Sequence, residues 1–481
     1  MSRLGRLGRH DTRHDTSPYL QHAYIPVFAE STHERLKVTG HLPHTLDGLF
    51  AQIGPNPARP PRHTAAGRYN WFTQDGMVTA IRIADGEARW FRNRWIRSRN
   101  ACHALGEKRP PGPRRFPIDT VNTNLLAHGG RLLALVETGC LPTHLTPTLD
   151  TLAYTDLDGA IPYGFSAHPK TCPRTGELHL IASSPLRTSA DYLVLDRDGR
   201  RLHSTRIPLN GRPMIHDIAL TPHHLLFFIS PVQFTPSLAV RGYFPYLWDQ
   251  RRSTQIGVLP RRGTAADVRW IDIPDCFVFH LVGAYEDPTS RVIHLAAIRY
   301  PRIFTRPGED PLAREGTLWN WRIDPRLGLA TPSQLGDLPH ELPRSDPRRL
   351  GQLLRYYYAF AGTRPGAHAL RLPDTVIRHD LVTGHDDRYQ LPAGETTSEA
   401  VFIPDPEHQD EDRGWIAHLT YRADNSPGTL SLLDAGDLAA GPVATVELPA
   451  RTTPGTHSNW FPADQLTMQP EESHDRANQK R

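Results

Sequence analysis

Short runs of apolar and β-branched residues, separated by turn residues, recur along most of the chain. Such runs, bounded by Gly, Asp and Asn, are typical of strands joined by tight turns. In WFTQDGMVTAIRIADGEARWFRNRWI (71–96), two Asp-Gly pairs separate strand-like runs, and Asp-Gly is a strong hairpin signal. Few helical patterns interrupt the series, so the sequence predicts an all-β protein. Further strand–turn–strand stretches are predicted at 125–137, 176–184, 191–207, 223–230, 291–300, 414–422 and 429–435.

The strand signals continue from about residue 18 to residue 465 without a linker-like shift in composition, which predicts one domain over 18–465. Residues 1–17 and 466–481 are polar or charged without periodicity, so we expect two disordered arms. No strict repeat is visible, although degenerate blades remain possible. Four-stranded blades around an axis would point inner strands at a central channel, so a β-propeller fits the pattern. Two irregular insertions, 109–119 and 232–252, are expected in a cap over one end.

Composition restricts the class of function. The 55 basic and 51 acidic residues are spread evenly and leave a net charge of +4, so no nucleic-acid footprint is visible. Of the basic residues 51 are Arg, which we attribute mainly to a GC-rich bacterial genome. No signal-peptide-like segment or run of about 20 apolar residues occurs, so we expect a cytoplasmic protein. Four widely spaced cysteines without a CxxC pair are expected to be reduced thiols: Cys102, Cys140, Cys172 and Cys276.

Four histidines occur in separate, strand-like contexts, with 48 to 177 residues between successive members. A zinc finger takes its ligands from one short segment, whereas ligands this dispersed converge only where several strands point at one axis. The pattern therefore predicts a metal ion at the hub of a radial β architecture. Imidazole ligands suit Fe, Cu, Zn or Ni, and the residues alone do not choose among them. The four are His168 in SAHPKTCPRTGEL, His216 in PMIHDIAL, His280 in CFVFHLVGAYED and His457 in PGTHSNWFP.

Three glutamates lie in equally apolar settings: Glu137 in LLALVETG, Glu341 in PHELPRSDPR and Glu399 in TTSEAVFIP. A metal-bound imidazole normally donates its other ring N–H to a carboxylate or a carbonyl group. A carboxylate is costly to bury without a donor, and such an imidazole N–H would supply one. The alternative for each glutamate is an exposed position at a strand edge.

The ordered motifs of this chain resemble those of the carotenoid cleavage oxygenases over nearly its whole length. They begin with SPYLQHAYIPV (17–27) and LKVTGHLPHTLDGLFAQIGPNP (36–57), followed by YNWFTQDGMV (69–78), FRNRWIRS (91–98) and VNTNLLAHGGRLLALVETGCLP (121–142). The AHP–TGEL, HD, FH and H-x-NW elements contain the four histidines, and ELPRSDPR and SEAVFIPDP contain two of the glutamates. Their number and order make the resemblance specific.

The resemblance implies a seven-bladed β-propeller with a dome of loops and short helices over an axial non-haem Fe(II), one per chain. His168, His216, His280 and His457 would bind the iron, and Glu137, Glu341 and Glu399 would accept hydrogen bonds from the ligands. The implied reaction is oxidative cleavage of a C=C bond of a carotenoid or apocarotenoid by O2 to two carbonyl products. No NAD, flavin or haem, and no nucleic-acid or protein partner, is implied.

Some positions depart from the family pattern. Val136 precedes the first glutamate where the stilbene-cleaving branch typically has a lysine that holds the substrate phenol. Thr456 and Ser458 flank the last histidine in THSNW where FHGNW is usual, and AQIGPNP replaces a commoner form. All seven iron-site residues are retained. The alternatives are a stilbene or phenylpropenoid dioxygenase and a non-catalytic polyene-binding propeller. Isomerisation with ester cleavage, as in the visual-cycle branch, is disfavoured by the bacterial composition.

An apolar polyene partitions into membranes, so we expect peripheral contact with a membrane surface. The aromatic and aliphatic cluster that follows the second histidine motif is our candidate for the substrate tunnel mouth or the membrane patch. The alternative is that this cluster packs inward as part of the dome. The candidate residues are Phe234, Tyr243, Phe244, Leu247 and Trp248.

Overall fold

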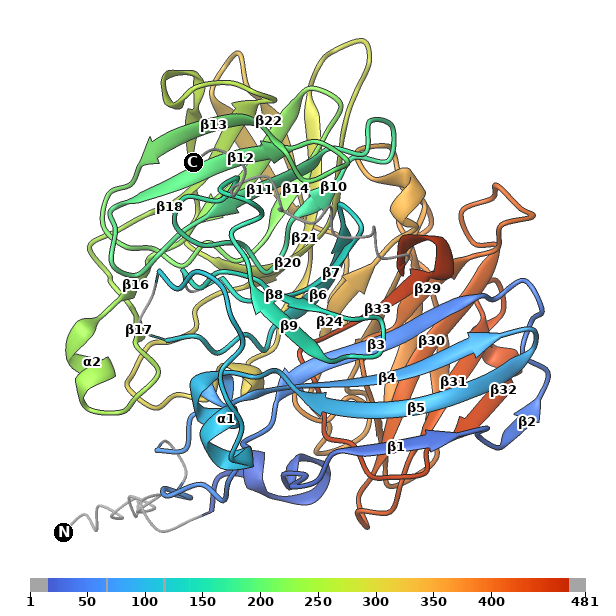
Figure 1. The fold of residues 1–481 in the computed structure, drawn as a ribbon. Coiled ribbons are helices and arrows are strands. Elements are labelled where there is room, and N and C mark those ends of the chain that lie inside the picture. Colours follow the sequence, from blue (N-terminus) through green and yellow to red (C-terminus); the bar gives the residue numbers. More distant parts are fainter. Residues whose placement is uncertain (1–15, 66–67, 116–117, 138, 467–481) are drawn as a thin grey trace, which may run out of the picture.

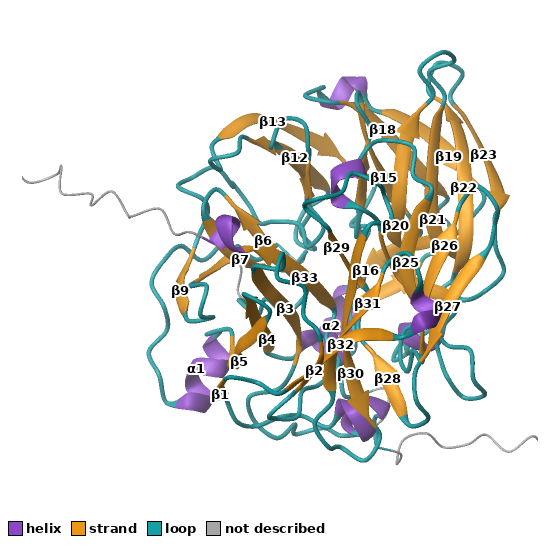
Figure 2. Cartoon of the chain, turned by 90° about the vertical axis from the view of Figure 1, so that its right-hand side faces the viewer, coloured by secondary structure: helices purple, strands orange, loops and turns teal. Residues whose placement is uncertain are grey.

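Seven antiparallel sheets are arranged around one axis, which confirms the predicted seven-bladed β-propeller (Figure 1). This computed structural model describes residues 16–65, 68–115, 118–137 and 139–466. Strands dominate, and the helices are short and lie in connections (Figure 2). No helix of these residues is long and apolar enough to cross a membrane.

Five blades are built from strands in sequence order from the axis outward, and in blade 4 residues 230–253 are inserted between the second and third strands. Blade 2 contains β6 (Asn124–His128), β7 (Arg131–Leu135), β8 (Thr143–Leu145) and β9 (Thr151–Tyr154). Blade 3 contains β10 (Lys170–Thr171), β11 (Leu178–Ala182), β12 (Ser189–Leu195) and β13 (Arg201–Pro208). Blade 4 contains β14 (Ile218–Leu220), β15 (His224–Ile229), β18 (Thr254–Pro260) and β19 (Arg269–Ile273). Blade 5 contains β20 (Phe277–Glu286), β21 (Ile293–Tyr300), β22 (Thr317–Asp324) and β23 (Leu329–Gln334). Blade 6 contains β24 (His340–Arg344), β25 (Tyr356–Ala361), β26 (Thr375–Asp380) and β27 (Asp386–Gln390).

The two ends of the chain close the ring by exchanging strands. Blade 1 contains β3 (Gly48–Pro55), β4 (Gly76–Ala84), β5 (Glu87–Trp95) and β1 (Ser31–Glu34), with the C-terminal β33 (His457–Pro462) added on the axial side. Blade 7 contains β28 (Glu395–Thr397), β29 (Val401–Pro404), β30 (Gly414–Arg422), β31 (Thr429–Asp434) and β32 (Pro442–Glu447), with the N-terminal β2 (Val38–Gly40) on its outer edge. The blue and red strands therefore lie side by side in Figure 1. Both exchanges hydrogen-bond a sheet edge that would otherwise be unpaired.

Of the two predicted Asp-Gly turns, one joins a hairpin and the other does not form. Asp85 and Gly86 have φ of +52° and +72° and join β4 to β5, as an Asp-Gly turn of this type requires. The prediction that Asp75 and Gly76 also form a turn is wrong, because β4 begins at Gly76. The Asp75 carboxylate instead accepts hydrogen bonds from the Ser98 hydroxyl at 2.9 Å and from the Ala58 N–H at 3.2 Å.

Segments from different blades pack together as a cap at one end of the ring. Tyr19 stacks on Trp71 with ring centroids 5.4 Å apart, and Phe72 lies 5.4 Å from Phe244. The cap includes the predicted insertion 232–252, which forms the hairpin β16 (Val232–Phe234) and β17 (Tyr246–Trp248) around the helix α2 (Pro236–Val240). Short 3-10 helices complete it: η1 (Pro18–Leu20), η2 (His22–Tyr24), η3 (Trp71–Thr73) and η5 (Pro311–Ala313).

The other predicted insertion, 109–119, does not join this cap. Its described residues contain no helix or strand, come between the helix α1 (Arg99–Leu105) and blade 2 in the sequence, and lie against the outer strand of blade 2. The N–H of Tyr154 at the end of β9 donates to the carbonyl of Pro111 at 2.9 Å, and the Arg114 guanidinium lies over the Tyr154 ring. An edge strand has N–H groups that are not paired within its sheet. The insertion supplies a hydrogen-bond partner for one of them, at the end of β9. The remaining 3-10 helices are η4 (Ala265–Asp267), η6 (Pro347–Arg349), η7 (Leu438–Ala440) and η8 (Ala463–Leu466).

The expected disordered arms fall mostly outside the described residues. Where they are described, their inner ends belong to the fold: the Ser17 N–H donates to the Thr64 carbonyl, and Leu466 ends η8 and packs against the core. The four cysteines are buried thiols, as expected for a reduced protein.

The apolar core is divided among the interfaces between neighbouring blades. Phe50 and Phe91 of blade 1, for example, pack with Leu419 and Leu430 of blade 7 in one buried cluster. Each large apolar side chain buried in this way contributes roughly 1.5–3 kcal/mol. Two histidines, His179 and His418, are fully buried in the same layers. Burial lowers the pKa of each ring to about 4.

We expect these two histidines to make the protein sensitive to acid. Below pH 6.5 the unfolded chain binds a proton at each ring, whereas the folded chain does not until about pH 4. Stability should therefore fall as the pH falls from 6.5 to 4, by about 1.4 kcal/mol per pH unit for each histidine. Calorimetric unfolding midpoints of the protein and of the His179→Gln/His418→Gln variant would check this. The variant should lose part of the pH dependence, and an unchanged slope would contradict the account.

Candidate metal centre

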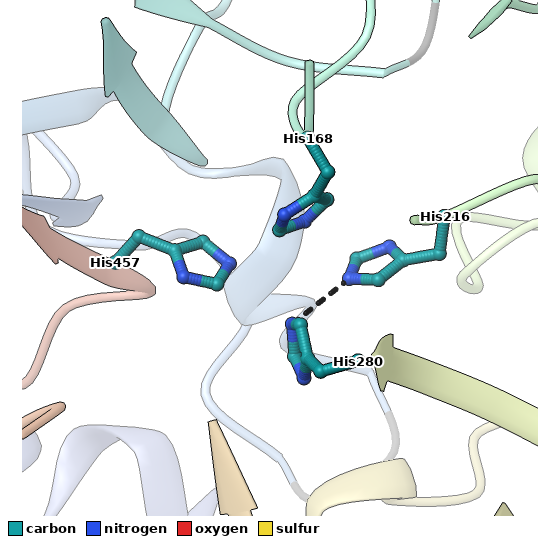
Figure 3. A group of neighbouring side chains, drawn as sticks. All are labelled: His168, His216, His280 and His457. Carbon is teal, nitrogen blue, oxygen red and sulfur yellow. Dashed lines mark hydrogen bonds between the residues drawn. The ribbon is translucent and has the colours of Figure 1, made fainter. Parts of the chain in front are cut away.

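The four predicted histidines meet on the propeller axis, each presented by an inner strand. His168 and His216 lie two residues before β10 and β14, His280 lies within β20, and His457 is the first residue of β33. One ring nitrogen from each can be chosen so that all four lie within 4.8 Å of one another. The rings point toward a common centre (Figure 3). First strands of neighbouring blades contact one another, which is why residues so distant in sequence converge.

The spacing of the rings fits one shared metal ion. Nε2 of His216 lies 3.2 Å from Nε2 of His280, and two nitrogens bound at about 2.1 Å to one ion would lie roughly 3.0–3.4 Å apart. Nε2 of His168 is buried and has no hydrogen-bond partner among the described residues. A buried ring nitrogen is costly to leave without a partner, and a metal ion would supply one. The donor set therefore fits a divalent transition-metal ion.

Three of the four imidazoles donate their outer N–H to the predicted glutamates. Nδ1 of His216 lies 3.0 Å from Oε1 of Glu137, Nδ1 of His280 lies 2.7 Å from Oε2 of Glu341, and Nδ1 of His457 lies 3.2 Å from Oε1 of Glu399. Because a carboxylate only accepts, each Nδ1 carries the proton and each Nε2 is left with a lone pair for the centre. The histidine and the glutamate of each pair come from different blades.

Further donors hold the buried glutamates in place. Glu341 accepts from the Tyr300 hydroxyl at 2.7 Å and from the N–H of Leu342 at 2.6 Å. Leu342 has φ of +50°, in a register shift between Glu341 and Arg344, and this strained backbone turns its N–H toward the carboxylate. Glu399 accepts from the N–H of Ser458 at 2.6 Å and lies 3.5 Å from the Arg344 guanidinium.

The protonation states suit a metal centre. Burial lowers the pKa of His168 far below its ordinary value, and the other three rings add to this shift, so His168 is neutral. Burial alone would raise the pKa of Glu399, but the Arg344 guanidinium and the His457 ring bring it to about 2. Burial alone would lower the pKa of His280, but the Glu341 carboxylate outweighs burial and raises it.

An aromatic path leads from the cap to the histidines. Phe279 packs edge-on against His216 at 5.1 Å and lies 6.0 Å from the His280 ring. Phe304 lies 6.3 Å from Phe279, and Phe244 of the cap stacks on Phe304 at 5.4 Å. The side of the centre toward the cap is therefore lined by apolar side chains.

The predicted cap cluster is divided between core and surface. Phe234, Tyr243, Phe244 and Leu247 are half-buried, whereas Trp248 is buried and packs with Val232 and Phe277. Phe234, Leu247 and Trp248 border a cavity of about 470 Å³. Next to them, Val240 at the end of α2 is 89% exposed.

Several residues around the centre were not predicted from the sequence. Phe279 and Tyr300 give no signal beyond a strand pattern. Asp217 directly follows His216, and Lys170 is one of four lysines in the chain, so both carried a weak signal. They form an ion pair, with Nζ of Lys170 2.8 Å from Oδ1 of Asp217.

The chain is similar to known proteins over most of its length. A family model described as retinal pigment epithelial membrane protein (RPE65) matches residues 24–462. The chain is 34% identical to a carotenoid cleavage oxygenase of Mycobacterium tuberculosis, covering 93% of this chain and 98% of that protein. It is 30% identical to the isoeugenol monooxygenase of Pseudomonas nitroreducens, covering 95% of this chain and 100% of that protein.

Solved structures show the same fold. The lignostilbene dioxygenase of Pseudomonas brassicacearum superposes with a TM-score of 0.83 at 27% identity, covering 93% of this chain and 98% of the other. Cobalt-substituted apocarotenoid oxygenase of Synechocystis superposes with a TM-score of 0.81 at 25% identity, covering 92% and 98%. The family model spans most of the propeller, including all four histidines and the three glutamates. The chain therefore belongs to the RPE65/carotenoid oxygenase family.

Proposed function

We propose that this protein is a non-haem Fe(II) dioxygenase that cleaves one C=C bond of a carotenoid or apocarotenoid. The double bond and one O2 molecule give two carbonyl groups, so the reaction balances without an external reductant. The observation that carries the proposal is the set of four converging imidazoles. Nε2 of His168 has no partner among the residues that the structure describes, and glutamates lie behind the other three rings.

The charges around the centre favour a divalent ion. Glu137, Glu341 and Glu399 bring three negative charges, and the guanidinium of Arg344 offsets one of them. The Lys170–Asp217 pair adds no net charge. With neutral imidazoles, about two negative charges remain, and a divalent ion neutralises them. Buried charge that is not compensated is costly, so this balance supports a divalent ion, with which Fe(II) is consistent.

Iron, when bound, would supply the dioxygen chemistry. The residues of this chain hold and orient it: the four histidines would bind it, and the glutamates fix the ring tautomers. Phe279, Phe304 and Phe244 exclude water on the side toward the cap. The bond that is cleaved would depend on how far the polyene reaches under the cap, which is a matter of shape.

Cleavage of a phenylpropenoid or stilbene is the second candidate. It is supported by similarity to the isoeugenol monooxygenase and to the lignostilbene dioxygenase. Val136 argues against a phenolic substrate, because it is buried against Cys140 and Leu145 and offers no charge to a phenol. We therefore favour the polyene.

We further propose that the protein is cytoplasmic and takes its substrate from a membrane surface at the cap. Val240 projects from α2, and Arg241 beside it is also exposed. The Arg68 guanidinium lies over the ring of Tyr243, 4.9 Å from its centroid. Apolar and basic side chains on one short helical segment are suited to an anionic lipid surface.

Substrate assays would distinguish the two candidate functions. We expect the protein, reconstituted with Fe(II) without oxygen, to bind one iron per chain, and His280→Ala to reduce that binding. On exposure to air with β-carotene, an apocarotenal, resveratrol or isoeugenol in separate detergent assays, the polyenes should give aldehydes. Mass spectrometry of these products would locate the cleaved bond. Cleavage of resveratrol or isoeugenol alone would favour the second candidate, and no product with iron bound would contradict both.

The glutamates should control metal affinity. Glu341→Gln keeps the shape of the side chain but removes the charge behind His280, so we expect affinity for Co(II) to fall about 10–100-fold. Glu286→Gln is a matched control, because Glu286 is also buried and lies 3.0 Å from Nδ1 of His224, away from the centre. It should leave Co(II) affinity unchanged. Equal losses in the two variants, measured by chelator competition, would show that the effect is not local.

The membrane contact can be tested at α2. Val240→Asp should weaken sedimentation with vesicles of phosphatidylcholine and phosphatidylglycerol by about tenfold, because it replaces an inserting apolar group with a charge. Val382→Asp is the control, since Val382 is 73% exposed at the end of β26. Equal vesicle binding by both variants and the unmodified protein would exclude α2 as the contact.

A further inference from the structure

One carboxylate, that of Asp217, joins the strands that present three of the four histidines. Asp217 follows His216, and its Oδ1 accepts from the N–H of Ile218 at 2.7 Å. Its Oδ2 accepts from the N–H of Leu281, the residue after His280, at 3.0 Å. Its Oδ1 also lies 2.8 Å from Nζ of Lys170, two residues after His168. Asp217 therefore connects blades 3, 4 and 5 directly beside the centre.

The backbone of β20 is shaped for this contact. The pairing of β20 with β21 shifts register between Val278 and Leu281 and again before Gly283. Such a bulge leaves a backbone N–H unpaired between the two strands, so that this N–H can donate a hydrogen bond to another group. The N–H of Leu281 uses this freedom to reach Asp217. The side chain of Asp217 is only 3% exposed, and a carboxylate this buried is tolerated because three donors satisfy it.

Asparagine side chains make the equivalent connection for the fourth histidine. Asn459 lies two residues after His457, and its Nδ2 donates to Oδ1 of Asn124 at 2.9 Å. Nδ2 of Asn124 donates to the carbonyl of Ala167, the residue before His168, at 2.7 Å. Nη2 of Arg344 donates to Oδ1 of Asn459 at 2.6 Å. Blades 6, 1, 2 and 3 are linked in this way.

Together these contacts form a closed belt around the axis. Arg344 joins blade 6 to Glu399, between β28 and β29 of blade 7, and to Asn459 of blade 1. Asn459, Asn124 and the carbonyl of Ala167 continue to blade 3. Lys170 and Asp217 continue to blades 4 and 5, and the hydrogen bond from His280 to Glu341 returns to blade 6. Within this belt, the salt bridge between Lys170 and Asp217 directly links the segment that carries His168 to the segment that carries His216.

We propose that Asp217, together with Lys170, is a positioning residue that holds His168, His216 and His280 at metal-binding distance before the metal arrives. The inference rests on the proposed function, in that it takes the four histidines to be a metal centre. A site held in its binding geometry loses less conformational entropy when the ion binds. Asp217 touches none of the imidazoles through a hydrogen bond, so it acts through the backbone beside them.

The alternative is that Asp217 only stabilises the fold, and Asp380 provides a matched control. The Asp380 carboxylate, at the end of β26, accepts from the N–H groups of Val382 and Thr383 at 2.8 and 3.2 Å. It also accepts from Nη2 of Arg355 at 3.0 Å. Asp380 thus has a similar burial and a similar donor set, but no link to a histidine of the centre.

The experiment titrates the metal-free protein and its variants with Co(II), recording the visible d–d absorption, with a competing chelator to fix the affinity. Asp217→Asn should lower the affinity at least tenfold and change the Co(II) spectrum. Asp380→Asn should lower the thermal unfolding midpoint but keep the affinity and the spectrum. Lys170→Met should lower the affinity for Co(II). Lys170→Arg keeps the positive charge, so its affinity should lie within about threefold of that of the unmodified protein. If Asp217→Asn does not fold, the two Lys170 variants decide the result.

An Asp217→Asn protein with unaltered affinity and spectrum, or equal losses in Lys170→Met and Lys170→Arg, would overturn the positioning role. If the unmodified protein binds no Co(II) or Fe(II), the proposed function fails, and crystal structures of the metal-free proteins then test the positioning alone. The distance between the ring centroids of His168 and His216, 4.5 Å here, should lengthen in Lys170→Met, because the salt bridge to Asp217 is what links the His168 segment to the His216 segment. An unchanged distance in that crystal would also overturn the proposal.

Discussion

The hydrogen bond from a ligand imidazole to a buried carboxylate is the interaction on which this centre depends. Four imidazoles carry no charge of their own, so the fold must place negative charge just behind them. Each of the three histidine–glutamate pairs joins two different blades: His216 with Glu137, His280 with Glu341, and His457 with Glu399. The packing of the blades and the orientation of the imidazoles therefore both require each of these glutamates to lie directly behind a histidine of another blade.

The sequence predicted the architecture because strands and turns are local signals. Alternating apolar runs identified the strands, and Asp85 with Gly86 identified a hairpin turn. The four histidines were predicted because each lies in a strand context, and the resemblance to a family implied that they are metal ligands. The predicted turn at Asp75 and Gly76 was wrong, because the Asp75 carboxylate accepts hydrogen bonds from Ser98 and Ala58. These partners are distant in sequence, and a local pattern does not reveal them.

What sequence reasoning missed lies between blades. The strand pattern places Phe279 beside His280, but not against His216 of the preceding blade. Tyr300 reaches Glu341 only because blades 5 and 6 are neighbours. Asp217 contacts Lys170 and the N–H of Leu281 through a bulge that periodicity does not reveal. Which residues of one blade face which of the next is set by tertiary packing, and a local pattern contains no information about it.

Closure of the ring and completion of the centre are one event. His457 is the first residue of β33, and β33 reaches the axis by pairing with β3 from the other end of the chain. The fourth imidazole, with Glu399 behind it, is therefore in place only when blade 1 is closed. An ion that binds the closed form and not the open one stabilises the closed form by mass action. If the centre holds a metal ion, as proposed, metal binding and the exchange of terminal strands would reinforce each other, and the stability of the whole propeller would depend on a site at its axis.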